Sequence, residues 1–63
     1  MNFRIEKMNH QLTYIGENKK AISFNGYAFI NTDNNMCMII AYGESRRDSI
    51  IKYFNELGDR LVT

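Results

Sequence analysis

The chain has 63 residues and a formal net charge of +1, because eight lysine and arginine residues nearly balance seven aspartate and glutamate residues. A domain of this length buries only about 60% of the surface that its unfolded chain exposes. We therefore expect a single domain over residues 1–63 with marginal stability. The two signs of charge are interleaved along the sequence, which excludes a strong field that would draw the chain onto duplex DNA or an anionic membrane.

The cysteine and histidine content limits the supports that so short a chain can use. Cys37 is the only cysteine, so an internal disulfide is impossible. One cysteine and one histidine are too few for the usual four-ligand zinc site, and we predict no metal and no cofactor. Small chains without these supports are often stabilised by oligomerisation. A homodimer is therefore expected.

The sequence also bears on location. The longest apolar run, residues 36–42, is far too short for a transmembrane helix, and no membrane association is predicted. The first residues have no basic region followed by an apolar run, so no secretory signal is predicted. A lone thiol agrees with a reducing, cytoplasmic location. The abundance of Asn, Ile, Lys and Tyr without any proline is typical of A/T-rich genomes, including those of phages.

The N-terminal segment has the period-two pattern of a strand with one buried face. Phe3 and Ile5 are apolar, whereas Arg4 and Glu6 are charged, which predicts a strand over residues 3–8.

A second short strand is predicted over residues 12–15. It follows a turn that contains His10, and it ends in a polar turn over residues 16–20 that begins with glycine. No Cys, Asp or Glu stands near His10 at ligand spacing, so we expect a solvated side chain rather than a ligand or a base.

Residues 21–31 allow two interpretations. Asn25-Gly26 is the strongest dipeptide signal for a two-residue hairpin turn, but the apolar alternation keeps the same register on both sides of it. We favour one continuous strand with a bulge at Gly26, because four-residue strands would bury little surface. The strand then has two faces, one with Ile22, Phe24, Ala28 and Ile30 and one with Ser23, Asn25, Tyr27 and Phe29.

A turn is predicted over residues 32–35, followed by a strand over residues 36–42 that is apolar on both faces and therefore covered on both. Gly43 ends this strand. Ser45 with Asp48 three residues later resembles a capping box and predicts the start of a helix.

The helix is predicted from a single apolar stripe. Its members follow spacings of four, three and four and are Ile50, Phe54, Leu57 and Leu61. Gly58 is expected to cap the helix in the left-handed conformation, with Leu61 and Val62 folding back on the last turn.

These elements predict an α+β fold: an antiparallel sheet of about four strands in meander order, with one C-terminal helix packed on one face. A single helix leaves the other face uncovered. The small Cys37 and Ala41 would let the helix approach closely, which places Cys37, Ile39 and Ala41 on the helix side. If Ile22, Phe24, Ala28 and Ile30 join that side, the exposed apolar residues are Tyr27, Phe29, Met36, Met38, Ile40 and Tyr42.

An exposed patch rich in methionine and aromatic residues is typical of an interaction site. We predict a non-catalytic regulator or inhibitor, phage-like in its small size, that binds a protein partner through Tyr27, Phe29, Met36, Met38 and Tyr42. Two occupants of the patch stay open, a second copy of the chain and a different protein. The sequence has no phosphate-binding glycine loop, nucleophile elbow or His-Glu metal helix, so no catalysis is predicted.

A short resemblance supports an alternative. Gly26-Tyr27-Ala28-Phe29-Ile30 is similar to the first ribonucleoprotein motif of RNA-recognition and cold-shock domains, in which alternate aromatics stack on bases. Asn25 stands in place of the basic residue and Thr32 in place of the last aromatic. The resemblance implies binding of single-stranded nucleic acid, with bases on Tyr27 and Phe29 and phosphates on Lys19, Lys20, Arg46 or Arg47.

The run Met36-Cys37-Met38 has the soft sulfur ligands that copper(I) prefers. Strand alternation would send the Cys37 thiol to the opposite face from both thioethers, and no metal site is predicted there.

Overall fold

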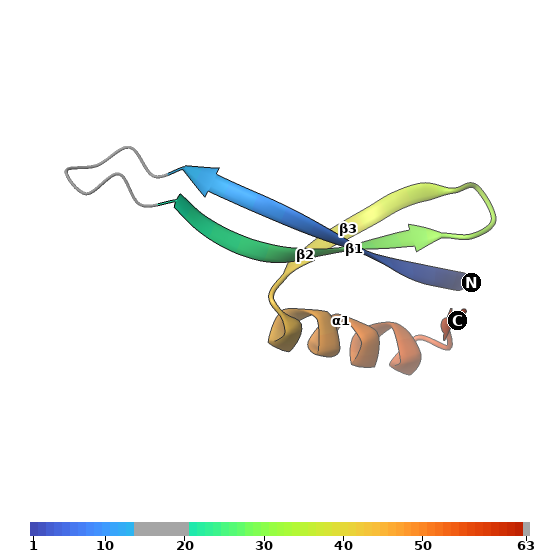
Figure 1. The fold of residues 1–63 in the computed structure, drawn as a ribbon. Coiled ribbons are helices and arrows are strands. Elements are labelled where there is room, and N and C mark those ends of the chain that lie inside the picture. Colours follow the sequence, from blue (N-terminus) through green and yellow to red (C-terminus); the bar gives the residue numbers. More distant parts are fainter. Residues whose placement is uncertain (14–20, 63) are drawn as a thin grey trace.

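A computed structural model describes residues 1–13 and 21–62. These residues form a four-stranded sheet with one helix packed on one side of it (Figure 1). The prediction of an α+β fold with about four strands is confirmed. The elements are β1 (Asn2–Thr13), β2 (Ala21–Asn31), β3 (Met36–Tyr42), α1 (Glu44–Glu56) and β4 (Arg60–Leu61), and the strand order in the sheet is β3-β2-β1-β4.

β1 is one long strand rather than the two short ones predicted. It pairs with β2 in antiparallel fashion from Phe3 opposite Asn31 to Thr13 opposite Ala21. The turn predicted at His10 is wrong, because His10 lies within this ladder. Neither of its neighbours, Asn9 and Gln11, is a glycine or a proline, which would interrupt an extended backbone. The predicted polar turn and the end of the predicted second strand fall within residues 14–20, which lie outside the described residues.

The continuous strand over residues 21–31 is confirmed, and the hairpin at Asn25-Gly26 is wrong. Both residues stay in register with β1. The predicted bulge at Gly26 is also misplaced, since the shift of register between β2 and β3 lies between Phe29 and Ile30 and leaves Met38 as the extra residue on β3. This bulge alters which side chains of β3 share a face.

The turn over residues 32–35 and the strand over residues 36–42 are confirmed. The helix begins earlier than the capping box predicted. Gly43 precedes it with φ of 91°, and no side chain caps the first turn. The glycine turns the chain directly from β3 into the helix, so Ser45 lies inside the first turn instead of at its cap.

The other end of α1 is capped as predicted. Gly58 has φ of 87°, its N–H donates to the Asn55 carbonyl at 3.1 Å, and the Asp59 N–H donates to the Phe54 carbonyl at 3.0 Å. These two bonds form a Schellman motif, which satisfies carbonyls that have no partner within the helix.

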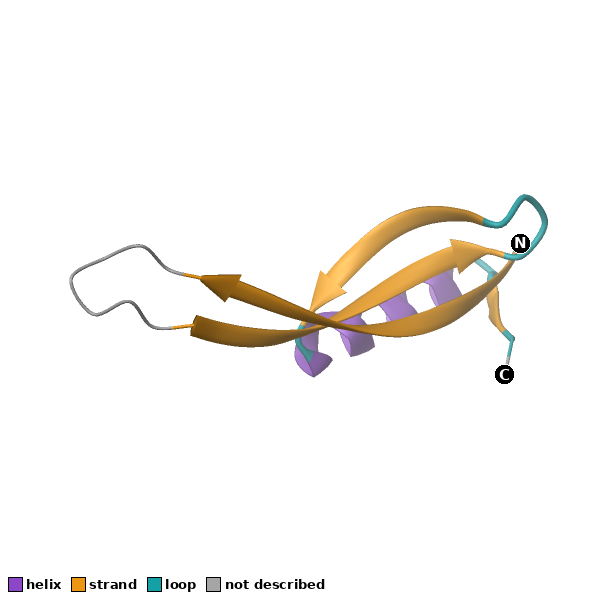
Figure 2. Cartoon of the chain, turned by 45° about the horizontal axis from the view of Figure 1, so that its top comes forward, coloured by secondary structure: helices purple, strands orange, loops and turns teal. Residues whose placement is uncertain are grey.

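The chain then crosses to the far edge of the sheet instead of folding back on the helix. Leu61 lies in β4, which pairs with β1 in parallel, Asn2 opposite Arg60 and Phe3 opposite Leu61. The strict antiparallel meander is therefore wrong. Because α1 returns the chain along the length of β3, the strand after it has the same direction as β3 and β1 (Figure 2).

The core lies between the sheet and α1. Phe3, Tyr27, Phe29 and Ala41 are buried, and Ile5, Ile50, Ile51 and Phe54 pack partly buried against them. Three phenylalanine rings contact one another, with centroid distances of 5.8 Å for Phe3–Phe29, 5.1 Å for Phe3–Phe54 and 5.7 Å for Phe29–Phe54. Each such pair adds about 0.5–1.5 kcal/mol to the burial of its area. No residue of α1 is fully buried, so this core is small.

The first two strands extend beyond the rest of the fold. β3 pairs only with residues 26–31 of β2, so the ends of β1 and β2 nearest their connection form a two-stranded ribbon (Figure 1). The dimensions are 47 × 21 × 16 Å and the radius of gyration is 14.2 Å, whereas a compact chain of this length would have about 11 Å. Among the described residues no helix is both long and apolar enough to cross a membrane.

Candidate protein-binding surface

Cross-strand pairing assigns the two faces of the sheet, because residues directly opposite each other project to the same side. Tyr27 lies opposite Ala41, and Phe29 lies opposite both Ile5 and Ile39. Tyr27, Phe29 and Ala41 belong to the core under α1, with exposed fractions of 4%, 0% and 1%. This face is the helix face.

The predicted placement of Tyr27 and Phe29 on the uncovered face is therefore wrong. Ala41 and Ile39 lie on the helix face, as predicted, but they share it with Tyr27 and Phe29 and not with Ala28 and Ile30. β2 is a central strand with apolar residues on both sides, so its periodicity alone does not say which side meets the helix. The register with β3 decides it, because it aligns Tyr27 with Ala41.

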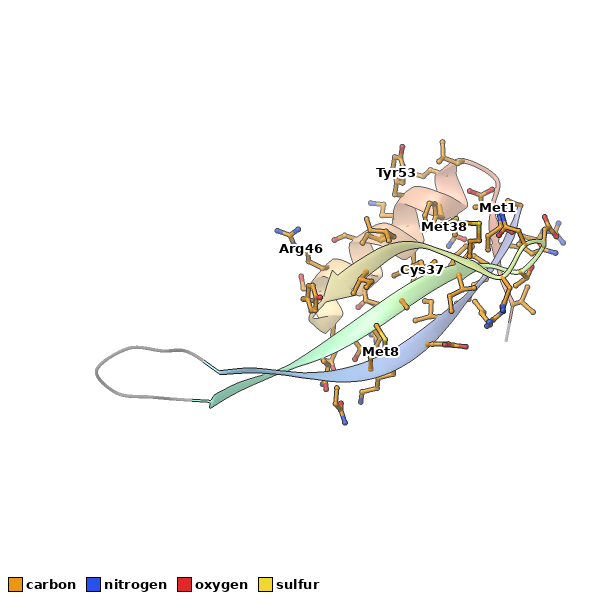
Figure 3. The ribbon with its side chains drawn as sticks, turned by 90° about the horizontal axis from the view of Figure 1, so that it is seen from above. Met1, Met8, Cys37, Met38, Arg46 and Tyr53 are labelled. Carbon is orange, nitrogen blue, oxygen red and sulfur yellow. The ribbon has the colours of Figure 1, made fainter. Side chains whose placement is uncertain are left out.

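We call the opposite side the open face, since no described element packs on it. Its residues form three rows across β1, β2 and β3, which are Met8–Gly26–Tyr42, Glu6–Ala28–Ile40 and Arg4–Ile30–Cys37. Figure 3 views this side of the sheet, with Met8 on β1 and Cys37 on β3 labelled. Ala28 and Ile30 of the central strand are buried, whereas Ile40 and Tyr42 are 39% and 49% exposed.

The apolar residues of β3 are unusually exposed for so short a chain. Besides Ile40 and Tyr42, they include Met36 at 64%, Met38 at 37% and Ile39 at 43%. Of the five predicted partner-binding residues, the structure exposes three on β3 and buries the two on β2. By register, Tyr42 lies on the open face together with Ile40 and Met8, whereas Met36 lies on the helix face and Met38 is the unpaired residue of the bulge.

The bulge at Met38 explains why the predicted faces of β3 fail at its first residues. Cys37 was expected under the helix, but it pairs with Ile30 on the open face, and Met36 pairs with Asn31 in register with Phe3 on the helix face. Strict alternation does not hold across a bulge. Strand alternation therefore does not separate the three sulfurs of Met36, Cys37 and Met38. Among the described residues no three His, Cys, Asp or Glu side chains gather as metal ligands do.

The β1 side of the open face is charged. Arg4 Nε lies 3.2 Å from Glu6 Oε1, and the Arg4 guanidinium also donates to Asn35 Oδ1 in the turn before β3. The Arg4 side chain therefore spans β2 at the level of Ile30, which pairs with Arg4 and is only 7% exposed. The alternating charge pattern of β1 predicted the face of Arg4 but not this contact.

Of the residues predicted for nucleic-acid binding, Tyr27 and Arg47 contact each other within the fold. The Arg47 guanidinium lies 4.8 Å from the centre of the Tyr27 ring and its Nε lies 2.9 Å from Asp48 Oδ1. The hydrogen bond to Asp48 raises the pKa of Arg47 above its ordinary value. Tyr27 Oη donates to Glu44 Oε1 at 3.5 Å. Both Arg47 and Tyr27 are thus engaged within the fold.

Arg46 projects away from the sheet at the start of α1 (Figure 3). Lys19 and Lys20 lie outside the described residues. The described residues hold no exposed aromatic pair on β2 on which bases would stack, because Tyr27 and Phe29 are both buried.

A shallow hollow of about 460 Å³ lies beside α1 and is lined by Asp48, Ile51, Lys52, Asn55 and Glu56. Its lining comes from one helix only and holds no histidine, cysteine or serine. The arrangement offers neither a nucleophile with a base nor a set of converging donors.

No family model matches the chain, and the comparisons with curated proteins and with solved structures found no match.

Proposed function

We propose that the chain is a non-catalytic interaction protein, a small regulator or inhibitor, that binds a protein partner through the open face on the β3 side. The contact residues are Met38, Ile40 and Tyr42 of β3 with Met8 of β1. The observation that carries this proposal is that Ile40 and Tyr42 keep 39% and 49% of their surface exposed on a face that no described element covers.

The chemistry of this surface suits a protein partner. Methionine adapts to irregular apolar surfaces, and a tyrosine supplies contact area together with a polar tip. The charged pair Arg4–Glu6 lies on β1, across β2 from the contact residues of β3. An apolar centre with a polar side is the usual anatomy of a protein–protein interface.

Single-stranded nucleic acid is the less favoured partner. The alternative depends on Tyr27 and Phe29 stacking on bases, and both rings are buried beneath α1. Stacking on them would require the helix to leave the sheet, which would expose the whole core.

The test is capture of partners from the producing cells with three forms of the tagged protein: wild type, Tyr42→Asp and Tyr53→Asp. Tyr53 is 59% exposed on α1 and serves as the matched control. We expect one protein that wild type and Tyr53→Asp retain and that Tyr42→Asp loses, with binding reproduced by purified components and little affected by salt.

Circular dichroism of the three forms establishes that each is folded. Equal capture by all three would remove the open face as the site. A salt-sensitive rise in mass with short single-stranded oligonucleotides would instead support the nucleic-acid alternative.

A further inference from the structure

β3 is an edge strand without a single charge. It pairs with β2 on one side only, and its residues Met36–Tyr42 are Met-Cys-Met-Ile-Ile-Ala-Tyr. Edge strands present a row of backbone groups that another strand can bind, and natural proteins usually protect them with lysine, proline or a covering element. β3 has neither lysine nor proline. An uncharged, exposed strand of this kind is suited to being paired.

The other edge of the sheet has the opposite character. β4 covers only Asn2 and Phe3, so the following residues of β1 also lack a neighbour on that side. Three of the next four residues are charged, namely Arg4, Glu6 and Lys7. Charges on an edge oppose pairing with another chain. Charges therefore protect the β1 edge of the sheet against pairing, whereas no charge protects the β3 edge.

We propose that a second copy of this chain pairs with β3 in antiparallel fashion, β3 against β3, and so joins the two sheets into one of eight strands. A two-fold axis makes the interface self-complementary. Pairing centred on Ile39 places this residue opposite itself, so that the helix faces of the two copies lie on the same side of the joined sheet. Every side chain at such an interface meets an uncharged neighbour, because both strands have the same uncharged sequence. A second copy is therefore complementary to β3.

The size of the core supports the same conclusion. Four buried residues form the core cluster, and Met36, Ile39 and Ile40 remain 64%, 43% and 39% exposed. A second copy would bury parts of these side chains and would pair with the outer edge of β3. Edge-to-edge pairing covers only the β3 border of each open face, so this proposal extends the proposed function and does not depend on it.

The first test measures mass by sedimentation equilibrium over a range of concentrations. We expect wild type to have twice the 7.4 kDa of the chain. Ile40→Lys places a charge in the interface on a residue already 39% exposed, and we expect it to weaken the dimer at least tenfold. Met36→Lys, at the most exposed position of β3, should weaken it too. Asn55→Lys on exposed α1 adds the same charge elsewhere and should leave the mass unchanged.

The second test shows whether β3 is the strand that forms the interface. In Ile39→Cys made on a Cys37→Ser background, the two thiols face each other across the axis, within the distance of about 4.5–5.5 Å between opposite Cβ atoms. Mild oxidation should give a covalent dimer. The native Cys37 thiols lie about 13 Å apart along this register, beyond the reach of a disulfide, and should not crosslink.

Each outcome decides the matter. A wild-type monomer at all concentrations overturns the proposal. A dimer that resists both lysine variants, or one that Ile39→Cys does not crosslink, places the interface elsewhere and also overturns it. Because Tyr42 also lies on β3, the Tyr42→Asp capture experiment is read together with the mass of that variant. Loss of a partner by a Tyr42→Asp protein that keeps the wild-type mass supports the proposed function by itself, and a heterologous partner bound by a monomeric wild type would preserve the proposed function while removing the dimer.

Discussion

The two edges of the sheet, β1 beyond its pairing with β4 and β3, have different residue patterns and opposite chemistry. β1 alternates apolar and charged residues, so its exposed side chains are solvated, and its first residues are covered by β4. β3 carries no charge and exposes five large apolar side chains to solvent. Because edge strands are the common route to unwanted association, charge on one edge and none on the other directs association to a single place.

The exposed fractions of the side chains also show which strand offers a surface to a partner. The aromatic residues of β2 are the ones that short-range sequence similarity would assign to a ligand, yet they are the centre of the core. The residues left for a partner are aliphatic side chains, methionines and one tyrosine, most of them on the outermost strand. The larger rings are buried because they fill the space beneath α1.

Erasing the difference between the edges should have the largest effect. The double variant Glu6→Ile with Lys7→Val gives β1 an apolar free edge. A dimer joined through β3 then has two further edges that can pair, so assembly continues into larger particles. We expect particles larger than a dimer that increase with concentration, measured by sedimentation velocity. If the double variant keeps the wild-type mass, the charges of β1 do not protect that edge.

Removal of the Phe29 ring tests the packing of the core between the sheet and α1. Phe29 is fully buried on the central strand, and Phe29→Ala should destabilise the fold by about 3–5 kcal/mol. A chain of this length has a total stability of about 3–9 kcal/mol, so urea titration should show that the variant has lost a large share of it. A Phe29→Ala protein as stable as wild type would contradict the assignment of β2's faces.

The bulge on β3 can be tested with a matched pair. Ala41 is 1% exposed beneath α1, whereas Cys37 is exposed on the open face. Ala41→Val overfills the core and should cost about 1–3 kcal/mol, and Cys37→Val should change the free energy of unfolding by no more than about 0.5 kcal/mol. Equal losses in urea unfolding would mean that both residues face the helix, as strict alternation predicts.

The charges of β1 should contribute little to stability itself. Glu6 forms an exposed ion pair with Arg4 at 3.2 Å, and such pairs stabilise by about 0.2–1 kcal/mol at most. Glu6→Gln should therefore shift the urea midpoint only slightly, and less so at high salt. A large loss would show that Glu6 acts as a structural residue and not as protection of the edge.

Much of the local structure could be predicted from the sequence. Apolar periodicity and the turn residues gave the bounds of β2 and β3 and the approximate start of α1, and Gly58 marked the helix end. These features depend on neighbours in the sequence, such as the left-handed conformation that glycine readily adopts.

The remainder depends on contacts between distant residues. Nothing around Arg60 and Leu61 signals a strand, since β4 exists only because β1 offers a free edge beside it. The bulge at Met38 has no glycine to mark it, and it reverses the faces of Cys37 and Met36. The facing of Tyr27 and Phe29 required the register with Ala41, which pattern analysis of a single strand does not contain.

The most direct test of the account is hydrogen exchange of backbone amides by NMR at two protein concentrations. If β3 pairs with a second copy, the outward amides of residues 36–42 gain protection as concentration rises, while those of β1 from Arg4 to Asn9 on the opposite edge do not change. Protection of β3 that is independent of concentration, or that rises on β1 instead, would contradict the account.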